Sequence, residues 1–327
     1  MLNLLPSLLC CPEDLQKLQW GQEEAVCPKC SAKYPIVNEI PRLVPDKNYA
    51  DNFSFEWNNI GAKTQVDSFN QVGQSVKRFG DCMGWQESDV KGKLVLDVGC
   101  GSGRFCEIMC RWGADVIGLD YSKSVNAAKK NTDELGFAAE YVQGDALKLP
   151  FADGTFDAIY SIGVLQFTPD PLQGIREMCR VLKPGGLLGT SSIDVRTFRR
   201  MSHPRFILRP FLSKLPPATL YKIVKAWVKF ALPISRFMRN KLKLRFGLVE
   251  RITVVANYEG AVPGVDASNV FDWALLDTYD WLSPAYNNPQ RPKDIEKTFR
   301  DSGMENIISY PGDNNFRANK SGSTLKA

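Results

Sequence analysis

The sequence predicts an α/β protein built on a mostly parallel sheet with helices on both faces, and three observations support this. From about residue 94 onward, short apolar runs alternate with amphipathic segments, as strands and helices do in parallel sheets. The first apolar run ends in a glycine-rich turn. Asp97, Asp120 and Asp145 lie at or just after the ends of the first three runs, where sheets of this kind bind their ligands.

The elements follow in order along the chain. The expected parallel strands are Leu94–Val98, Ala114–Leu119, Ala139–Gln143, Phe156–Ser161 and Leu187–Ser191. Residues 171–182 predict a helix that ends at the Lys-Pro-Gly-Gly segment 183–186, because proline and glycine stop helices. Toward the C-terminus, Pro292–Ser302 predicts a helix and Ile307–Tyr310 a further strand.

Length and composition exclude several classes of protein. The chain has 327 residues, 44% of them hydrophobic and 24% charged, with 25 Gly and 20 Pro, which excludes collagen-like, low-complexity and largely disordered chains. No apolar stretch reaches the roughly 18 residues of a membrane-spanning helix. The opening MLNLLPSLLCCPED lacks a basic segment and is a poor signal peptide. The nine cysteines are therefore expected to be thiols or metal ligands in a cytoplasmic protein.

Residues 1–45 predict a small β unit that carries paired thiols. The segments CPED (11–14) and CPKC (27–30) each place two candidate ligands on a tight turn, as the knuckles of a zinc ribbon do. Asp14 stands where a second cysteine would be expected, so the candidate zinc ligands are Cys11, Asp14, Cys27 and Cys30. Cys10 is a substitute ligand, and a ribbon fold that has lost its metal is the alternative.

A basic helical insertion is expected at about residues 192–255. Residues 195–251 contain 15 Lys and Arg and one acid, whereas the rest of the chain contains 26 Lys and Arg and 35 acids, so the net charge of +5 conceals two opposed regions. Within the insertion, apolar residues recur at helical spacing, lysines flank them and Pro233 is expected to end the helix: Leu220, Ile223, Val224, Trp227 and Ala231, with Lys222, Lys225 and Lys229.

This basic segment has three interpretations. It is a lid whose lysines are merely solvated, or an amphipathic surface that lies on an anionic membrane through Trp227 and Phe230 and reaches a lipid-linked acceptor. The third interpretation is a surface that binds RNA phosphates. The apolar content of the segment ranks RNA below small-molecule, glycan or lipid-linked partners.

The segment DVGCGSG, residues 97–103, is the strongest candidate for a ligand site. Glycines after a strand let the backbone approach a ligand, and the following helix offers unpaired N–H groups. A dinucleotide fingerprint would need glycine where Arg104 stands, which disfavours nicotinamide or flavin. Asp120 could accept both hydroxyls of a ribose, and Asp145 could bond an adenine amino group. Each acid alone could be a helix cap, but the three in order favour a nucleoside ligand.

At this point the sequence resembles a known family. LDVGCGSGRF, VIGLDYS, YVQGDALKLPFADGTFDAIYSIGVL and RVLKPGG are similar to the successive motifs of class I S-adenosylmethionine-dependent methyltransferases of type 11, the group of ubiquinone and menaquinone methylases. The resemblance spans residues 94–191. It implies a Rossmann-like, seven-stranded sheet, one methyltransferase domain over residues 46–327 interrupted by the insertion, and S-adenosylmethionine across the strand ends.

The resemblance also implies which residues bind the cofactor. The glycine loop would hold the methionine moiety, Asp120 the ribose, Asp145 and Ala146 the adenine, and Ser161 and Ile162 the surroundings of the methyl group. Residues 1–45 resemble a zinc-ribbon-like unit found ahead of many bacterial methyltransferases, and FEW (55–57) and TQVDSF (64–69) resemble a segment that folds over the cofactor. The expected cofactor residues are Trp57, Gln65, Asp97, Gly99, Cys100, Gly101, Gly103, Asp120, Tyr121, Ser122, Asp145, Ala146, Ser161 and Ile162.

The acceptor side departs from the family pattern. SIGVLQFTPDP has Gln166 and Phe167 where the family usually has two histidines, so a base must come from elsewhere. The chain has one histidine in all. Asp170, Tyr279 and Asp280 are candidate bases, and we expect the last two to be catalytic.

Several acceptor-side questions stay open. The segment 276–284 containing Tyr279 and Asp280 is equally a packed loop that anchors Trp281. Gln166, Phe167 and Trp281 are the expected substrate residues. The functional prediction is a cytoplasmic methyltransferase that acts on a small-molecule, sugar or lipid-linked acceptor. Peripheral contact with the inner membrane face through residues 195–251 is the alternative location. The alternatives are an rRNA or tRNA methyltransferase and a cofactor-binding partner protein without activity.

Overall fold

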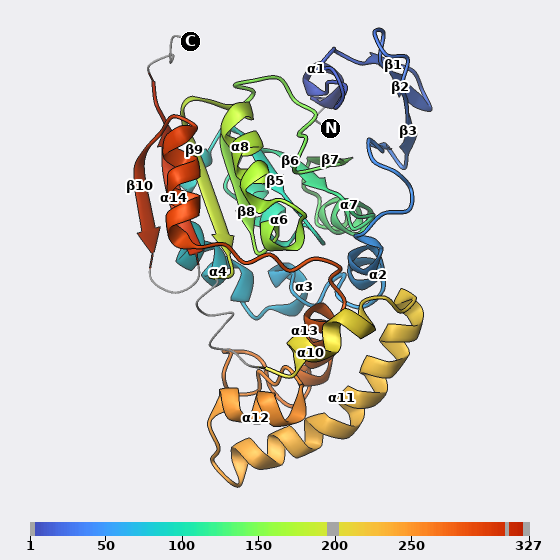
Figure 1. Ribbon diagram of the computed structural model, residues 1–327, viewed down its shortest axis with the longest axis vertical. Coiled ribbons are helices and arrows are strands. Elements are labelled where there is room, and N and C mark those ends of the chain that lie inside the picture. Colours follow the sequence, from blue (N-terminus) through green and yellow to red (C-terminus); the bar gives the residue numbers. More distant parts are fainter. Residues whose placement is uncertain (1–3, 195–202, 311–313, 323–327) are drawn as a thin grey trace.

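Seven strands form one sheet in the order β10-β11-β9-β8-β5-β6-β7 (Figure 1). The computed structural model describes residues 4–194, 203–310 and 314–322. Five neighbouring strands are parallel, while β11 runs antiparallel to both β9 and β10. Their bounds are β5 Leu94–Val98, β6 Asp115–Asp120, β7 Ala139–Gln143, β8 Phe156–Ile162, β9 Leu182–Ser192, β10 Met304–Tyr310 and β11 Asn314–Lys320.

The five parallel strands lie where the sequence predicts them, and the α/β class is confirmed. Strand β9 is longer than predicted, because residues 183–186 continue the strand instead of forming the turn that was expected. A register shift between Phe156 and Ala158 of β8 accommodates this glycine-containing stretch. The sequence analysis did not locate β11, whose residues NNFRANK are mostly polar although Phe316 and Ala318 are buried.

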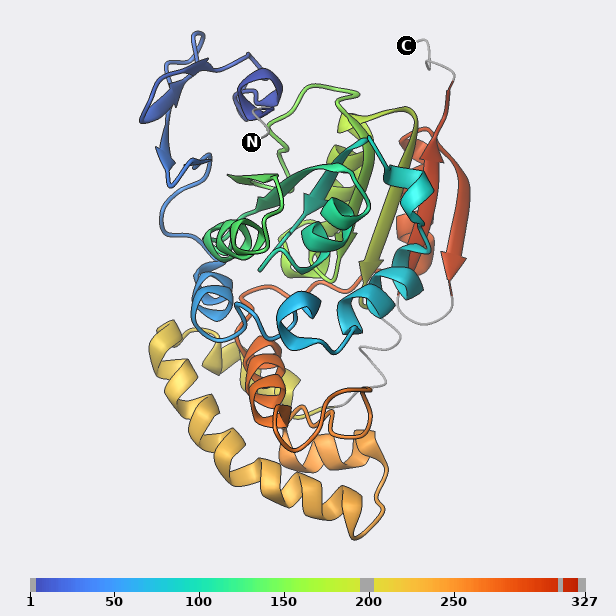
Figure 2. The same ribbon diagram turned by 180° about the vertical axis from the view of Figure 1, so that it is seen from behind.

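Helices cover both faces of the sheet (Figures 1 and 2). Helices α8 (Pro171–Val181) and α14 (Pro292–Asp301) pack together on one face, and α4 (Gln74–Met83), α6 (Arg104–Arg111) and α7 (Val125–Glu134) lie on the other. Helix α8 begins at Asp170, whose side chain accepts a hydrogen bond from the backbone N–H of Gln173 at 3.1 Å. Two buried apolar clusters, one on each face, form the core.

The N-terminal residues form a small four-stranded antiparallel sheet beside the edge strand β7. Its elements are α1 Leu5–Leu8, β1 Gln19–Trp20, β2 Glu24–Val26, β3 Lys33–Val37 and β4 Ile40–Pro41. The backbone N–H of Cys10 donates to the carbonyl of Pro150 at 2.8 Å, and Lys148 pairs with Glu13 at 2.6 Å. Leu5, Leu9 and Cys11 join the same buried cluster as the large sheet, so the two units share a core.

A helical lobe lies beyond the carboxyl ends of the parallel strands (Figure 1). It consists of α10 Arg205–Leu212, α11 Pro217–Asn240, α12 Phe246–Thr253 and α13 Val270–Leu282. Between the lobe and the sheet lie α2 Asp51–Asn59, α3 Asp67–Asn70 and the 3-10 turn Leu165–Phe167. The short helix α5 Glu87–Val90 precedes the amino end of β5. The first eight residues of the segment 195–251 lie outside the described residues.

Two expectations about this lobe were wrong. Helix α11 does not end at Pro233 but continues to Asn240. A proline removes one N–H from the helix, and burial of Ala231, Leu232 and Ser235 on both sides of it keeps the helix packed against the lobe core. The alternative of a packed loop at 276–284 is also wrong, because residues 276–282 form the second half of helix α13, which packs against α11.

In the part of the chain that the structure describes, none of the helices combines the length and the apolar composition required to traverse a lipid bilayer.

Candidate functional site

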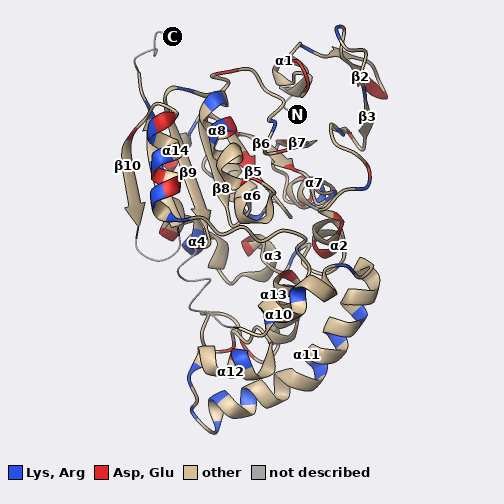
Figure 3. Cartoon of the chain, in the orientation of Figure 1, with Lys and Arg blue, Asp and Glu red and all other residues tan. Residues whose placement is uncertain are grey.

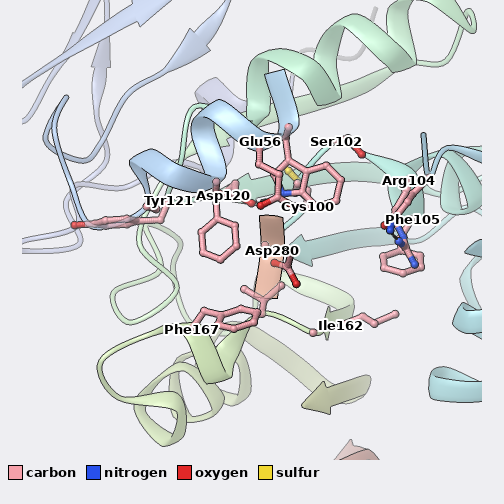
Figure 4. Close-up of a pocket in the computed structure, with 18 of the residues that line it drawn as sticks. Glu56, Cys100, Ser102, Arg104, Phe105, Asp120, Tyr121, Ile162, Phe167 and Asp280 are labelled. Carbon is pink, nitrogen blue, oxygen red and sulfur yellow. Dashed lines mark hydrogen bonds between the residues drawn. The ribbon is translucent and has the colours of Figure 1, made fainter. Parts of the chain in front are cut away.

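A cavity of about 280 Å³ opens where the carboxyl ends of β5, β6 and β8 meet helices α2 and α13 (Figure 4). Strand order changes direction at β5, which is flanked by β6 on one side and β8 on the other, and open α/β sheets bind ligands at such a point. The expected cofactor and substrate residues that line the cavity are Trp57, Gln65, Gly99, Cys100, Gly101, Asp120, Tyr121, Ala146, Ile162, Phe167, Asp280 and Trp281.

The glycine loop after β5 forms the floor of the cavity. Gly99 has φ +86°, and a β-carbon at this position would collide with the side chain of Val164. Gly101 has φ +53°, and a β-carbon there would lie 3.4 Å from the ring of Trp57. Left-handed backbone and this close approach both favour glycine. The Trp57 ring therefore lies close against this loop, which lines the cavity.

Asp120 links the end of β6 to this loop. Its Oδ2 accepts a hydrogen bond from the backbone N–H of Gly101 at 3.0 Å, and its Oδ1 accepts from the backbone N–H and Oγ of Ser122 at 2.8 and 2.7 Å. Burial raises the pKa of Asp120, and these hydrogen bonds oppose the shift. A carboxylate has about four lone-pair sites, so the group keeps capacity for a ligand hydroxyl.

Five of the expected cofactor residues do not line the cavity. Asp97 is buried beneath the loop, where Tyr160 donates to its carboxylate at 3.0 Å and Cys106 at 3.3 Å. Burial raises the pKa of Asp97 to about 7. Ser122 bonds Asp120, and Ser161 donates to the carbonyl of Val98 at 2.9 Å. Gly103 is the residue before α6, packed against α7, and Asp145 accepts from the backbone N–H of Leu147 at 2.8 Å.

Two tyrosines stand at the Asp120 end of the cavity. The rings of Tyr49 and Tyr121 stack with centroids 4.6 Å apart, and both line the cavity near Ala146. Tyr286 meets Tyr49 edge-on at 5.1 Å. Tyr121 was expected from the sequence, whereas Tyr49 was missed, since it lies in a segment with no recognisable motif. The pair offers flat apolar surfaces of the kind that contact a nucleoside base.

Phe167 and Asp280 lie near one another in the cavity wall (Figure 4), and Trp281, which follows Asp280 on α13 of the helical lobe, also lines the cavity. Burial and the neighbouring Asp277 raise the pKa of Asp280 to about 6, while Arg209 and Arg205 oppose this. Asp280 is therefore the expected base that the structure brings to the cavity.

The remaining acceptor-side candidates lie elsewhere. Tyr279 is fully buried on another face of α13, 3.4 Å from Asn52 Oδ1 and 3.5 Å from the carbonyl of Pro217. Gln166 is 2% exposed and is not among the residues that line the cavity. Asp170 caps helix α8. These positions separate the three residues from Asp280.

A buried polar network of Gln65, Arg104 and Asp277 lines another part of the cavity, and no motif in the sequence indicates that these residues meet. Gln65 donates from Nε2 to Asp277 at 3.0 Å and accepts a hydrogen bond from Arg104. Burial lowers the pKa of Arg104 to about 9, and Asp277 opposes this shift. Residues of three distant segments meet here, so only their common position at the strand ends brings them together.

Glu56 is the other cavity residue that was missed. It directly precedes Trp57 on α2 and is 1% exposed. Burial, followed by the negative charges of Asp280 and Asp277, raises its pKa well above the ordinary value. The motif FEW contains it, but the sequence alone does not reveal that α2 turns this side chain inward.

The four candidate zinc ligands converge in the N-terminal unit. The ligand atoms of Cys11, Asp14, Cys27 and Cys30 all lie within 4.8 Å of one another. Cys27 Sγ lies 3.4 Å from both carboxylate oxygens of Asp14. Cys10 lies outside this cluster, with its thiol 3.7 Å from the carbonyl of Leu8. Three sulfurs and one carboxylate at this spacing are a donor set suited to tetrahedral zinc.

Comparisons with known proteins identify the domain that contains this cavity. Residues 96–189 match the sequence model of a family described as a methyltransferase domain, which confirms the expected resemblance. The ubiquinone biosynthesis O-methyltransferase of Aliivibrio fischeri is 41% identical over 105 residues, which cover 32% of this chain and 45% of that protein.

Two further relatives are similar over a longer part of the chain. Demethylmenaquinone methyltransferase of Renibacterium salmoninarum is 34% identical over 149 residues, 42% of this chain and 61% of that protein. Methyltransferase GfsG of Streptomyces halstedii is 39% identical over 168 residues, 50% of this chain and 57% of that protein. The chain spans about half the length of the curated relatives it matches.

Proposed function

We propose that this chain, which carries an S-adenosylmethionine-dependent methyltransferase domain, transfers a methyl group from S-adenosylmethionine to a small-molecule acceptor. One observation carries the proposal. The Asp120 carboxylate accepts a hydrogen bond from the glycine loop at the floor of the cavity, and aromatic and acidic side chains line the wall that faces this floor. The matched family and the relatives named as small-molecule methyltransferases support it.

The cavity residues fit this cofactor. The glycine loop that lines the cavity would contact the methionine moiety through its backbone, and Asp120 retains lone pairs for ribose hydroxyls. The stacked pair Tyr49 and Tyr121 would contact the adenine, with Asp145 nearby as a further acceptor. When bound, the cofactor supplies a methyl group on a positively charged sulfur.

The protein itself would orient the reactants, exclude water and accept one proton from the acceptor. Trp57 and Phe53 cover the loop from α2 and shield the reacting centre, which strengthens electrostatic interactions there. Phe167 and Trp281 would position the acceptor for in-line attack. An oxygen or nitrogen acceptor loses a proton, and Asp280, whose pKa of about 6 lies near neutrality, would take it.

The proposed acceptor is an apolar small molecule that the protein reaches at a membrane surface. Five residues on one side of α11 form what we call the apolar stripe, at spacings of three and four residues and with exposures of 41–65%: Ile223, Trp227, Phe230, Ile234 and Phe237. Ile252 of α12, 56% exposed, extends this surface, since Trp227 donates to the carbonyl of Thr253 at 3.0 Å.

Positive charge surrounds the apolar stripe. Lysine and arginine side chains mark α11 and α12, with hardly any acidic residues among them (Figure 3). A basic, amphipathic helix with exposed aromatic residues is suited to the interface of an anionic membrane. We therefore favour a lipid-soluble acceptor over RNA, whose phosphates would not require the apolar stripe.

The decisive test is turnover. The purified protein should convert S-adenosylmethionine to S-adenosylhomocysteine when supplied with a lipid extract or quinol-like phenols, and Asp120→Ala should not. Binding of the cofactor without turnover on lipid extracts, phenols, glycans and total RNA would contradict the enzymatic proposal and support the non-catalytic partner protein. Turnover on RNA alone would contradict the proposed acceptor class.

A further inference from the structure

The carboxyl group of Glu56 is buried in the cavity wall without a hydrogen-bond partner. Its side chain is 1% exposed, and neither carboxyl oxygen is bonded by any residue that the structure describes. Two other cavity carboxylates differ in this respect, since Asp120 accepts three hydrogen bonds and Asp277 accepts a hydrogen bond from Gln65. A buried carboxyl without a partner is costly, so the cavity holds an unmet requirement for a donor or a cation.

The charges that act on Glu56 have the same sign as its own. Asp280 and Asp277 on α13 disfavour its ionised form, as burial does, and Glu56 in turn raises the pKa of Tyr279 on that helix. The cations nearby act on the aspartates instead: Arg205 and Arg209 from α10 on Asp280, Arg104 from α6 on Asp277, and Arg78 from α4 on both. Among the residues that the structure describes, Glu56 thus lacks the counter-ion that its two neighbours have.

The position of Glu56 indicates where the missing cation lies. It lines the cavity from α2, and the same cavity is lined by Cys100 after β5, by Asp120 at the end of β6 and by Asp280 on α13 (Figure 4). If Asp120 holds the ribose and the glycine loop holds the methionine moiety, then the atom that joins these two parts of the cofactor lies in this same space. That atom is the positively charged sulfur.

We propose that the Glu56 carboxylate is the counter-ion of the cofactor's sulfonium centre and distinguishes the charged methyl donor from the neutral product. The inference rests on the proposed function, because it takes the cofactor to be S-adenosylmethionine. In the free protein, burial and two aspartates favour the protonated form of the Glu56 carboxyl group. We expect the charged donor to favour the ionised form, so that donor binding is coupled to release of a proton.

Methyl transfer then reverses the charge of this pair. The bond from the methyl carbon to the acceptor forms, the carbon–sulfur bond breaks, and its electron pair stays on the sulfur, which becomes neutral. Glu56 loses its counter-ion and binds a proton again, which balances the proton that a hydroxyl or amine acceptor gives up, directly or through Asp280. The product, which has no positive charge on sulfur, leaves a cavity that no longer favours it electrostatically.

Calorimetry of binding tests this without turnover. S-adenosylmethionine and S-adenosylhomocysteine are each titrated into the wild-type protein at pH 7 in phosphate and in Tris, whose ionisation enthalpies differ. We expect the release of about one proton with the charged donor and none with the neutral product. Glu56→Gln should abolish the release and weaken binding of the donor about tenfold, while binding of the product stays within about twofold.

Asp280→Asn is the matched control, since it removes a neighbouring carboxylate of the same cavity. It should retain the proton release and move it to lower pH, because one negative charge no longer opposes ionisation of Glu56. Loss of the release in Asp280→Asn with retention in Glu56→Gln would overturn the assignment, as would equal weakening of donor and product by Glu56→Gln.

Two further measurements distinguish failure of this inference from misfolding of the variant and from failure of the proposed function. If Glu56→Gln does not fold, the ratio of donor to product affinity in the wild-type protein must rise with pH, and a constant ratio would overturn the inference. If neither compound binds the wild-type protein, the proposed function itself fails, which is a different result from binding without proton release.

Discussion

The Asp120 carboxylate accepts a hydrogen bond from the backbone N–H of Gly101 at 3.0 Å. This bond joins the end of β6 to the loop after β5 and places the carboxylate beside the glycine backbone that lines the cavity. Neither partner would form a ligand site alone, since one is an aspartate at a strand end and the other a glycine in a turn. Together they define where the ribose and the methionine moiety would meet.

Replacing Asp120 should weaken the cofactor site strongly. Asp120→Ala removes both the ribose acceptor and the bond to Gly101, and we expect the affinity for S-adenosylmethionine to fall by more than about tenfold, since hydrogen bonds to a charged group are strong. Calorimetry measures this. Asp115→Ala, at the other end of β6, is the control and should bind normally; unchanged affinity in Asp120→Ala would exclude the ribose assignment.

Substitutions of Asp280 and Tyr279, the two candidate bases on helix α13, should have different effects on kcat. Asp280→Asn should lower kcat about a hundredfold, because the acceptor proton loses its base. Tyr279→Phe should leave kcat unchanged and cost at most about 1 kcal/mol of unfolding free energy, because the Tyr279 hydroxyl makes only long contacts away from the cavity. A large loss of kcat in Tyr279→Phe with normal stability would show that the hydroxyl takes part in the reaction.

The N-terminal cluster should bind one zinc ion. Elemental analysis of the purified protein is expected to give about one zinc per chain, and Cys27→Ser or Cys30→Ser should remove it, since zinc requires four ligands. Cys10→Ser is the control, because Cys10 lies outside the cluster. Zinc that persists in Cys27→Ser and Cys30→Ser would exclude this site, and its loss in Cys10→Ser would mean that Cys10 is the ligand.

Membrane association should depend on the lysines beside the apolar stripe. The wild-type protein should sediment with vesicles that contain phosphatidylglycerol and much less with pure phosphatidylcholine vesicles. Reversal of three charges, Lys222→Glu, Lys225→Glu and Lys229→Glu, should abolish this binding because anionic lipids then repel α11.

A second triple reversal distinguishes a local effect from a change in net charge. Lys47, Lys130 and Lys293 are exposed and lie on other elements, so their replacement by Glu should preserve vesicle binding. Equal loss in both triple variants would mean that net charge alone matters. Loss of RNA binding, with no vesicle binding in the wild-type protein, would favour an RNA acceptor.

Stability should fall as pH rises through the range in which Asp97 ionises. The folded state holds the Asp97 proton up to a pKa of about 7, whereas the unfolded chain releases it near 3.8. Between these values the folded state binds more protons, so the unfolding free energy decreases with rising pH. Asp97→Asn should flatten this decrease in melting temperature between pH 4 and 7. An identical decrease in wild type and variant would show that other buried acids cause it.

The parallel strands and the cofactor end of the site were predictable from the sequence. Residues 94–98 are apolar and precede glycines, and Asp120 ends the next apolar run, so local pattern and spacing suffice to place both at one edge of a sheet. The ligand pairs Cys11/Asp14 and Cys27/Cys30 likewise predict a metal site, because the two members of each pair are close in the sequence. Strand β11 was missed because its residues are polar and gain their strand conformation from pairing with β9 and β10.

The tertiary structure alone decided which acids face the acceptor. Tyr279 and Asp280 are adjacent in sequence, but a helix turns successive side chains by about 100°, so one is buried against α11 and the other lines the cavity. Glu56 is more than two hundred residues from Asp280 in the chain, yet packing of α2 between the sheet and the lobe brings both into one wall. The sequence determined the sheet and the chemistry of its edge, whereas long-range packing determined the electrostatics of the cavity.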